Sequence, residues 1–286
     1  MEGFIMYSGE NVSLTKIEND FIELNFNNSV GSVNKLDKQT LDELYQALAS
    51  IKQAKNINGL LITSSKDAFI VGADITQFKQ MFEASEQQFL KSASHINGMM
   101  SAIEDLPFPT VVAINGYALG GGFEVCLSCD ARIAASTAKI GLPETGLGIL
   151  PGWGGTVRLP RLCDFATAVE WITSARQYNP DKAIASGIID KVVEPGQLRA
   201  EALQYLRDMA AGNIDYCLVR KRKLSPIDQP RAEIEAIANM AKAVVKQKTA
   251  GHYPAPIRAI ELITQSATLT RDQAIEKEAR VFYELS

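Results

Sequence analysis

The chain has 286 residues, of which 46% are hydrophobic and 22% charged, and its formal net charge is −4. This is ordinary globular composition, long enough for one large domain or two smaller ones around a sizeable core. The negative net charge argues against a surface that binds nucleic acid or anionic membranes over the whole protein. The sequence contains no run of about 18 apolar residues, so we predict no membrane-spanning helix.

Cysteines and the N-terminus indicate a reduced compartment. Four cysteines in a chain this long are typical of a cytoplasmic protein. Cys126 and Cys129 form a C-x-x-C pair, but with no second pair and only two histidines we expect no metal site there. A pair facing the core from one helix explains them better than redox chemistry. Glu2 stands where a signal peptide needs a basic residue, and no apolar stretch follows, so we expect no targeting peptide.

The first hundred residues mix strands and helices. Alternating apolar residues over 11–28 predict a β-hairpin. Asp37 is placed to cap a helix over 38–52, whose apolar residues share one face. A buried strand over 59–63, a loop over 65–75 that turns into a helix, and a helix over 86–105 that stops before Pro107 follow.

The middle of the chain alternates in the same way. We predict strands over 110–114, 131–135 and 139–142, a Gly- and Pro-rich loop over 143–155, short helices over 156–162, 164–175 and 180–186, and a strand over 188–193. Beyond residue 195 the pattern is almost all helical, with helices over 198–211, 231–249, 254–265 and 271–284. We therefore expect a mixed core over 1–195 and a helical region over 196–286. The basic run over 220–223 is predicted to be a solvated loop rather than an anion site.

The segment over 115–124 is the centre of the pattern. Three glycines, Gly120, Gly121 and Gly122, stand between the strand over 110–114 and an apolar helix that begins near Glu124. A helix N-terminus presents free N–H groups and a positive dipole end, and glycine lets a ligand approach the backbone. Glu124 adds a carboxylate within about one helical turn. An oxygen-binding hole beside a carboxylate indicates carbonyl chemistry.

A second turn and a second carboxylate complete this constellation. Gly72 and Ala73 end the loop over 65–75 as the glycines end the strand over 110–114, so each turn can offer one N–H to the same carbonyl oxygen. Glu144 follows Glu124 after two predicted strands that fold back toward it. Each feature alone has a simpler explanation, either a tightly packed glycine turn or a solvated glutamate.

Taken together, these motifs resemble the enoyl-CoA hydratase/isomerase (crotonase) family. The motifs are A-F-x-x-G-A-D-I at 68–75, N-G-Y-A-L-G-G-G-F-E at 115–124 and P-E-x-x-L-G-I-x-P-G-x-G-G at 143–155, within a likeness over about residues 10–200. Four further segments are most similar to the N-terminal part of the α-subunit of the bacterial fatty-acid oxidation complex: G-S-V-N-K-L-D at 31–37, F-I-V-G-A-D-I-T at 69–76, I-G-L-P-E-T at 140–145 and G-H-Y-P-A-P-I at 251–257.

The resemblance implies an α/β fold, a crotonase-type spiral of repeated ββα units followed by a C-terminal helical region. It also implies a homo-oligomer, or a complex with a thiolase β-subunit if the chain is part of a full α-subunit. The α-subunits continue into an NAD-binding dehydrogenase region, but no G-x-G-x-x-G follows a strand near the C-terminus here. We therefore expect an excised domain or a shorter relative, whose terminal helix over 271–284 lacks its usual packing partner and is mobile or swapped.

The resemblance also implies a reaction. The N–H groups of Ala73 and Gly121 would bind the thioester oxygen of a 2-enoyl-CoA, Glu124 would act as base and Glu144 as acid in adding water. Δ3-Δ2-enoyl-CoA isomerisation is the second expected activity. No cofactor beyond the CoA moiety of the substrate, and no metal, is expected.

The remaining predicted substrate contacts lie around these four residues: Lys35, Ala68, Ile70, Val71, Gly72, Asp74, Gly120, Pro143, Gly152 and Trp153. Lys35 is either a CoA phosphate contact or a surface lysine, Trp153 and Leu150 line the acyl pocket or belong to the core, and Asp74 is expected to cap the next helix. Two rival functions stay open: a non-catalytic acyl-CoA-binding or scaffold module, and a thioester hydrolase or other crotonase-fold chemistry, whose enzymes typically replace one or both glutamates.

Overall fold

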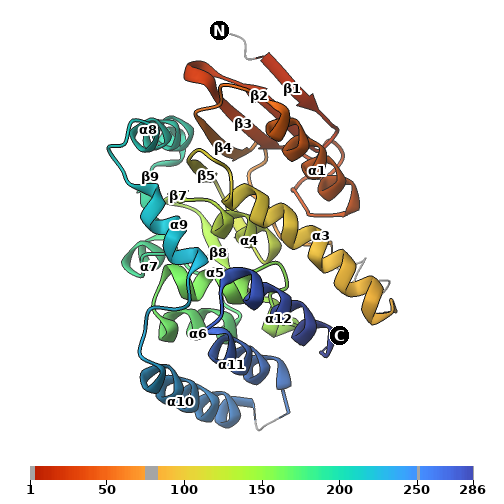
Figure 1. Cartoon of the computed structure of the whole chain (residues 1–286), viewed down its shortest axis with the longest axis vertical. Helices are drawn as coiled ribbons and strands as arrows, with labels where there is room; N and C mark the ends of the chain where they lie inside the picture. Colours follow the sequence, from red (N-terminus) through yellow and green to blue (C-terminus); the bar gives the residue numbers. More distant parts are fainter. Residues whose placement is uncertain (1–3, 75–82, 250–251, 286) are drawn as a thin grey trace.

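The computed structural model describes residues 4–74, 83–249 and 252–285. A seven-stranded sheet is formed by strands between residues 4 and 193, and helices pack on both of its faces (Figure 1). Its strand order is β1 (Phe4–Ser8), β2 (Val12–Lys16), β3 (Phe21–Phe26), β4 (Gly59–Ser64), β5 (Thr110–Ile114), β7 (Ala131–Ala135) and β9 (Lys191–Val193). Two short strands, β6 (Tyr117–Leu119) and β8 (Lys139–Gly141), form a separate parallel pair.

The strands confirm the α/β prediction. The predicted hairpin is the antiparallel pair β2–β3, and β3, β4, β5, β7 and β9 are parallel to one another. Parallel strands buried on both faces have continuous apolar sequences, which is why β5 is entirely buried. The edge strand β1 was not predicted, because its Phe4 and Ile5 are exposed and follow no alternating pattern. The helix expected after residue 75, with Asp74 as its cap, lies outside the described residues.

The predicted helices that lie within the described residues begin and end close to the predicted positions. Asp37 caps the first one, where its carboxylate accepts the N–H of Thr40 at 2.8 Å. Among the residues that the structure describes, no helix is both long and apolar enough to cross a bilayer. The helices are α1 (Lys38–Gln53), α3 (Glu86–Glu104), α4 (Gly121–Ser128), α5 (Gly155–Leu162), α6 (Phe165–Ser174), α7 (Pro180–Ala185), α8 (Leu198–Ala210), α9 (Tyr216–Leu224), α10 (Arg231–Thr249), α11 (Pro254–Ser266) and α12 (Arg271–Tyr283), with short 3-10 turns η1 (Glu18–Asp20), η3 (Glu144–Leu147) and η4 (Pro195–Gln197).

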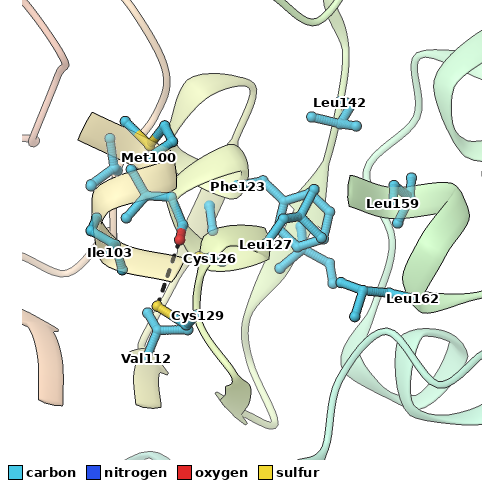
Figure 2. Packing of buried hydrophobic residues seen from close by; sticks show 14 of the residues in the cluster. Met100, Ile103, Val112, Phe123, Cys126, Leu127, Cys129, Leu142, Leu159 and Leu162 are labelled. Carbon is cyan, nitrogen blue, oxygen red and sulfur yellow. Dashed lines mark hydrogen bonds between the residues drawn. The ribbon is translucent and has the colours of Figure 1, made fainter. Parts of the chain in front are cut away.

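Helix α4 lies at the centre of the core, and all of its residues are buried (Figure 2). Apolar side chains surround it from α3, β5 and α5, among them Met100, Val112 and Leu159. Cys126 and Cys129 are free thiols within this core, and burial raises the pKa of Cys129 to about 12. The packing interpretation of the C-x-x-C pair is therefore confirmed.

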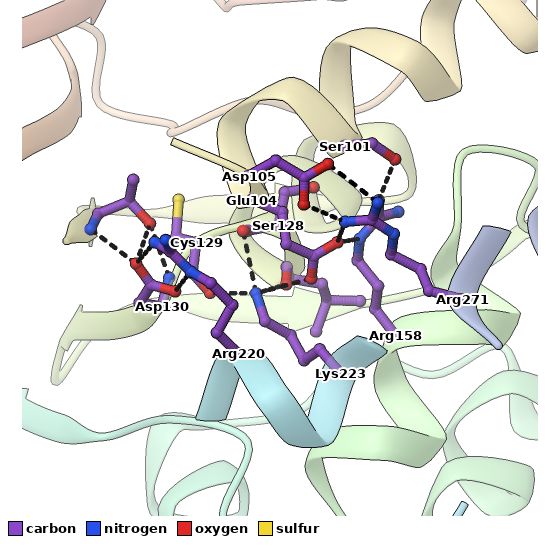
Figure 3. Close-up of polar contacts among 12 residues, drawn as sticks. Ser101, Glu104, Asp105, Ser128, Cys129, Asp130, Arg158, Arg220, Lys223 and Arg271 are labelled. Atoms are coloured by element: carbon purple, nitrogen blue, oxygen red, sulfur yellow. Dashed lines mark hydrogen bonds and ion pairs between the residues drawn. The ribbon is translucent and has the colours of Figure 1, made fainter. Parts of the chain in front are cut away.

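The prediction of a solvated loop at 220–223 is wrong. These residues belong to α9, and Lys223 is completely buried, 2.9 Å from the Glu104 carboxylate (Figure 3). Arg220 pairs with the buried Asp130 at 2.5 Å. Residues three apart share a helix face, so Arg220 and Lys223 point inward while Lys221 and Arg222 stay exposed. Burial raises the pKa of Glu104, but Lys223 and the nearby guanidinium groups hold it at about 2.

The last helix is not left without a partner, contrary to expectation. Helix α12 packs against α3, α5 and α11 of its own chain. Arg271, in its first turn, reaches Glu104 at 3.0 Å and Asp105 at 2.6 Å, and Phe282 near its end stacks on Phe89 at 5.5 Å. Helix α8 packs on β4, β5 and β7, so the first helix after residue 195 covers the sheet. The domain division at residue 195 stays a prediction.

The buried ion cluster gives the first test. We expect Lys223→Ala to lower the free energy of unfolding by about 3 kcal/mol, because it removes a buried partner of Glu104. Urea unfolding measures this change. The matched control Arg222→Ala, at the neighbouring exposed position, should change it by less than about 0.5 kcal/mol. Equal effects of the two substitutions would contradict the structural role of Lys223.

Candidate active site

Two parallel strands bring the two glutamates together. In the β6–β8 pair, Leu119 lies opposite Gly141, and the N–H of Gly120 donates to the carbonyl of Gly141 at 3.0 Å. Glu124 follows β6 in the first turn of α4, and Glu144 follows β8 at the start of η3. Parallel strands end at the same edge, so both carboxylates reach one cavity, as the returning two-strand excursion predicts.

Glu124 is held in one orientation by the backbone. It is 2% exposed, and its Oε1 accepts the N–H groups of Trp153 at 2.8 Å and Gly155 at 2.7 Å. Burial and the neighbouring Glu144 and Glu278 raise the pKa of Glu124 well above its ordinary value, although the two N–H donors act to lower it. Because Oε1 is occupied, the other oxygen is the one available for chemistry.

Glu144 has the opposite environment. Its Oε2 is buried and has no hydrogen-bond partner among the residues that the structure describes. Burial raises the pKa of Glu144 to about 8, and the charge of Glu278 adds to this effect. A buried carboxyl oxygen without a donor favours the protonated form of the group. Gly120 makes room for it, because a Cβ there would lie 3.0 Å from Glu144 Oε1.

The two glycine turns lie side by side. The N–H of Ile70 donates to the carbonyl of Tyr117, and the carbonyl of Ile70 accepts the N–H of Leu119, both at 3.0 Å. A Cβ on Gly122 would lie 2.2 Å from the carbonyl oxygen of Ile70, so only glycine permits this approach. Gly72 has φ +116°, a conformation that side chains disfavour.

Both turns direct an N–H away from their supporting strands. The carbonyl of Gly72 accepts the N–H of Leu36 at 2.9 Å, and because the peptide bond is trans, the N–H of Ala73 points the other way. Gly121 is the first residue of α4, so its N–H has no acceptor inside the helix. Both residues line the cavity. Their N–H groups could therefore bind the same oxygen atom.

The cavity between these elements has a volume of about 110 Å³. Most of the predicted site residues line it: Val71, Gly72, Ala73, Gly120, Gly121, Glu124, Pro143, Glu144, Gly152 and Trp153, together with Leu150. Four predicted contacts do not, namely Lys35, Ala68, Ile70 and Asp74. Ala68 and Ile70 are buried under the turn, and Lys35 pairs with Asp74 at 3.3 Å beside it.

Sequence reasoning missed part of the cavity wall, which comes from two helices. Helix α3 contributes Phe89, Ser92, Ala93 and Ile96, and α12 contributes Ala279 and Phe282. Leu147 and Ile149, in the loop after Glu144, also line it. The sequence predicts the helix over 271–284, but nothing local shows that one of its faces lies against the glutamates.

A comparison with known protein families agrees with this fold. The model of the family described as enoyl-CoA hydratase/isomerase matches residues 16–252. The chain belongs to the enoyl-CoA hydratase/isomerase family. It is thus a crotonase-fold enzyme of CoA thioesters. The more specific likeness to fatty-acid oxidation α-subunits stays a prediction.

Solved structures of other proteins share the fold. An enoyl-CoA hydratase from Bacillus anthracis is 29% identical, with 91% of this chain and 99% of that chain covered and a TM-score of 0.64. Pseudomonas aeruginosa DspI is 27% identical, with 75% of this chain and 85% of that chain covered and a TM-score of 0.64. The likeness therefore extends over most of the length of each structure.

The raised carboxyl pKa values predict a pH-dependent stability. The folded chain holds a proton on Glu144 up to about pH 8, whereas an unfolded glutamate releases it near its ordinary value of 4.5. Stability therefore falls as pH rises between these values, by up to about 1.4 kcal/mol per pH unit. We expect the free energy of unfolding of Glu144→Gln, relative to wild type, to increase between pH 5 and pH 8.

Urea unfolding across this pH range measures the difference. Glu276→Gln, which changes an exposed glutamate of α12, is the control and should show a constant difference from wild type. A Glu144→Gln difference that stays constant or decreases with pH would contradict the raised pKa.

Proposed function

We propose that this chain is an enoyl-CoA hydratase, which adds water across the double bond of a 2-trans-enoyl-CoA to give 3-hydroxyacyl-CoA. The observation that supports this most is the meeting of Glu124 and Glu144 in one cavity with the two glycine turns. Fatty acid β-oxidation and a cytoplasmic location are part of the same proposal. The reaction is proposed to need no cofactor besides the CoA moiety.

The turns would stabilise charge on the thioester. Addition of water to C3 of the enoyl group moves electrons onto the carbonyl oxygen, and N–H groups fixed in advance stabilise the resulting enolate by roughly 3 kcal/mol each. Ala73 and Gly121 are the proposed donors, since both line the cavity and neither N–H is directed at its supporting strand or helix.

The two glutamates would divide the proton transfers. Burial and two neighbouring carboxylates raise the pKa of Glu124, but the two N–H groups that it accepts oppose this rise and favour the carboxylate form, and with it the role of base toward water. Glu144 has an oxygen without a donor, which favours the protonated form and the role of acid toward the α-carbon. The proton of the water goes to Glu124, its hydroxide to C3, and the proton of Glu144 to C2. Exchange of protons with solvent or between the two groups restores them.

The same pair also supports Δ3-Δ2-enoyl-CoA isomerisation as a second activity. One carboxylate removes the proton from C2, the N–H groups stabilise the dienolate, and a carboxylic acid returns a proton to C4. The CoA moiety is proposed to pass near Lys35 and the main chain over 68–71. Lys35 is partly exposed, so its ammonium can reach a phosphate while keeping Asp74 close.

The rival functions are less well supported. Binding alone needs no carboxylates, and a buried carboxyl oxygen without a partner lowers the stability of the fold. In a protein that only bound acyl-CoA or served as a scaffold, Glu144 would therefore lower the stability of the fold without serving a function. A thioester hydrolase on this fold typically replaces one or both glutamates, and this chain has both.

Loss of absorbance of crotonyl-CoA tests the hydratase directly. We expect turnover by the wild type and a fall of about 1,000-fold in kcat in both Glu124→Gln and Glu144→Gln, because each removes one proton-transfer group. Glu276→Gln should keep the wild-type rate. Full activity in both site variants would exclude the two-carboxylate mechanism. Binding of a saturated acyl-CoA without any wild-type turnover would favour the binding module.

The aromatic pair at the cavity wall predicts chain-length selection. Phe282 stacks on Phe89 and lines the cavity, so its ring limits the space for the acyl tail. We expect Phe282→Leu to raise the ratio of kcat/KM for 2-decenoyl-CoA over crotonyl-CoA by about 5-fold or more, the effect of one or two extra methylene groups. Phe4→Leu, on the exposed edge strand, is the control. An unchanged ratio would place the tail elsewhere.

A further inference from the structure

A third buried carboxylate meets the site from the last helix. Glu278 of α12 is completely buried. One of its oxygens accepts the N–H of Gly154 at 2.6 Å, and the other accepts the N–H of Thr156 at 2.9 Å and the Thr156 hydroxyl. All three donors belong to the turn that also donates to Glu124.

Four successive N–H groups are shared alternately between the two carboxylates. Residues 153 and 155 donate to Glu124, and residues 154 and 156 donate to Glu278. The turn leads directly into α5, whose N-terminal dipole end favours negative charge. Movement of either pair of N–H groups would move the other pair, because consecutive peptide planes share a Cα atom.

The turn cannot accommodate residues larger than glycine at positions 154 and 155. Gly154 has φ +96°, and a Cβ there would lie 1.8 Å from Arg158 Nη1. A Cβ on Gly155 would lie 2.9 Å from Glu124 Oε1. Two side chains also hold the carbonyl groups of this segment: Arg158 donates to the carbonyl of Trp153 at 3.2 Å, and Asn97 donates to the carbonyl of Gly152 at 3.1 Å.

We propose that Glu278 is a positioning residue for Glu124, so that docking of α12 completes the active site. It does not touch the cavity, but it fixes the turn that orients the Glu124 carboxylate. This inference rests on the proposed hydratase function. It differs from a purely structural cap of α5, because a cap would affect stability and leave the turnover of folded protein unchanged.

The charged groups around Glu278 come from three elements. Arg158 and Arg161 of α5 attract its negative charge, while Glu124 of α4 and Glu144 of η3 repel it. Burial raises the pKa of Glu278 to about 7, and the donors of Thr156 and Gly154 lower it. Removal of its charge therefore lowers the pKa of both catalytic candidates.

Glu278→Gln is the direct test, measured on the full chain as kcat and KM for crotonyl-CoA and as the pH dependence of kcat. The amide keeps the shape, but its NH2 faces an N–H donor and so loosens the turn. We expect kcat to fall about 100-fold, the effect of a small misplacement of a catalytic group, with KM within about 3-fold. The acidic limb of the pH profile should move to lower pH.

Controls separate the inference from folding and from the proposed function. Thr156→Val removes only the hydroxyl donor and should lower kcat about 10-fold, which tests the inference if Glu278→Gln fails to fold. Glu276→Gln, on the exposed face of α12, should keep both constants. Wild-type kcat retained in folded Glu278→Gln, or in Thr156→Val when only that variant folds, overturns the inference. Absence of wild-type turnover overturns the proposed function instead.

Discussion

The site depends on the hydrogen bonds that the backbone turn over residues 153–156 donates to two carboxylates. Its four N–H groups bind Glu124 and Glu278 alternately, so two carboxylates from helices far apart in the sequence share one short piece of backbone. Below it, Arg158 connects the turn to Glu104, which also binds Lys223 and Arg271 (Figure 3). The geometry of the site is therefore connected to the ion cluster that anchors α9 and α12.

Burial of several carboxyl groups costs desolvation free energy, and the partners that offset this cost differ from one group to the next. Glu104 has three cationic partners, which keep its pKa at about 2. Glu124 and Glu278 have backbone donors, and Glu144 has an oxygen without any donor in the described part of the chain. This gradient separates groups that only stabilise the fold from groups that can exchange a proton. Glu144, whose oxygen has no donor, is one of the two carboxyl groups that line the cavity.

Local patterns made the centre of the site predictable. The glycine turns and the two glutamates lie in motifs of about ten residues, where strand, turn and helix signals coincide. The three-residue strands β6 and β8 are too short for periodicity to reveal, although their pairing aligns the glutamates. The contribution of α12 was also hidden, since an amphipathic helix shows which face is apolar but not what it faces. A run of basic residues predicts one exposed segment at 220–223, whereas helix periodicity divides the run between two faces and buries Lys223.

Amide hydrogen exchange at residues 153–156 tests the central claim most directly, because it reports each N–H of the turn without any substrate. In the wild type all four amides should exchange slowly and with similar rates. In Glu278→Gln the amides of Trp153 and Gly155, which donate to Glu124, should lose protection together with those of Gly154 and Thr156. Loss at Gly154 and Thr156 alone, with Trp153 and Gly155 still protected, would show two independent contacts and contradict the account.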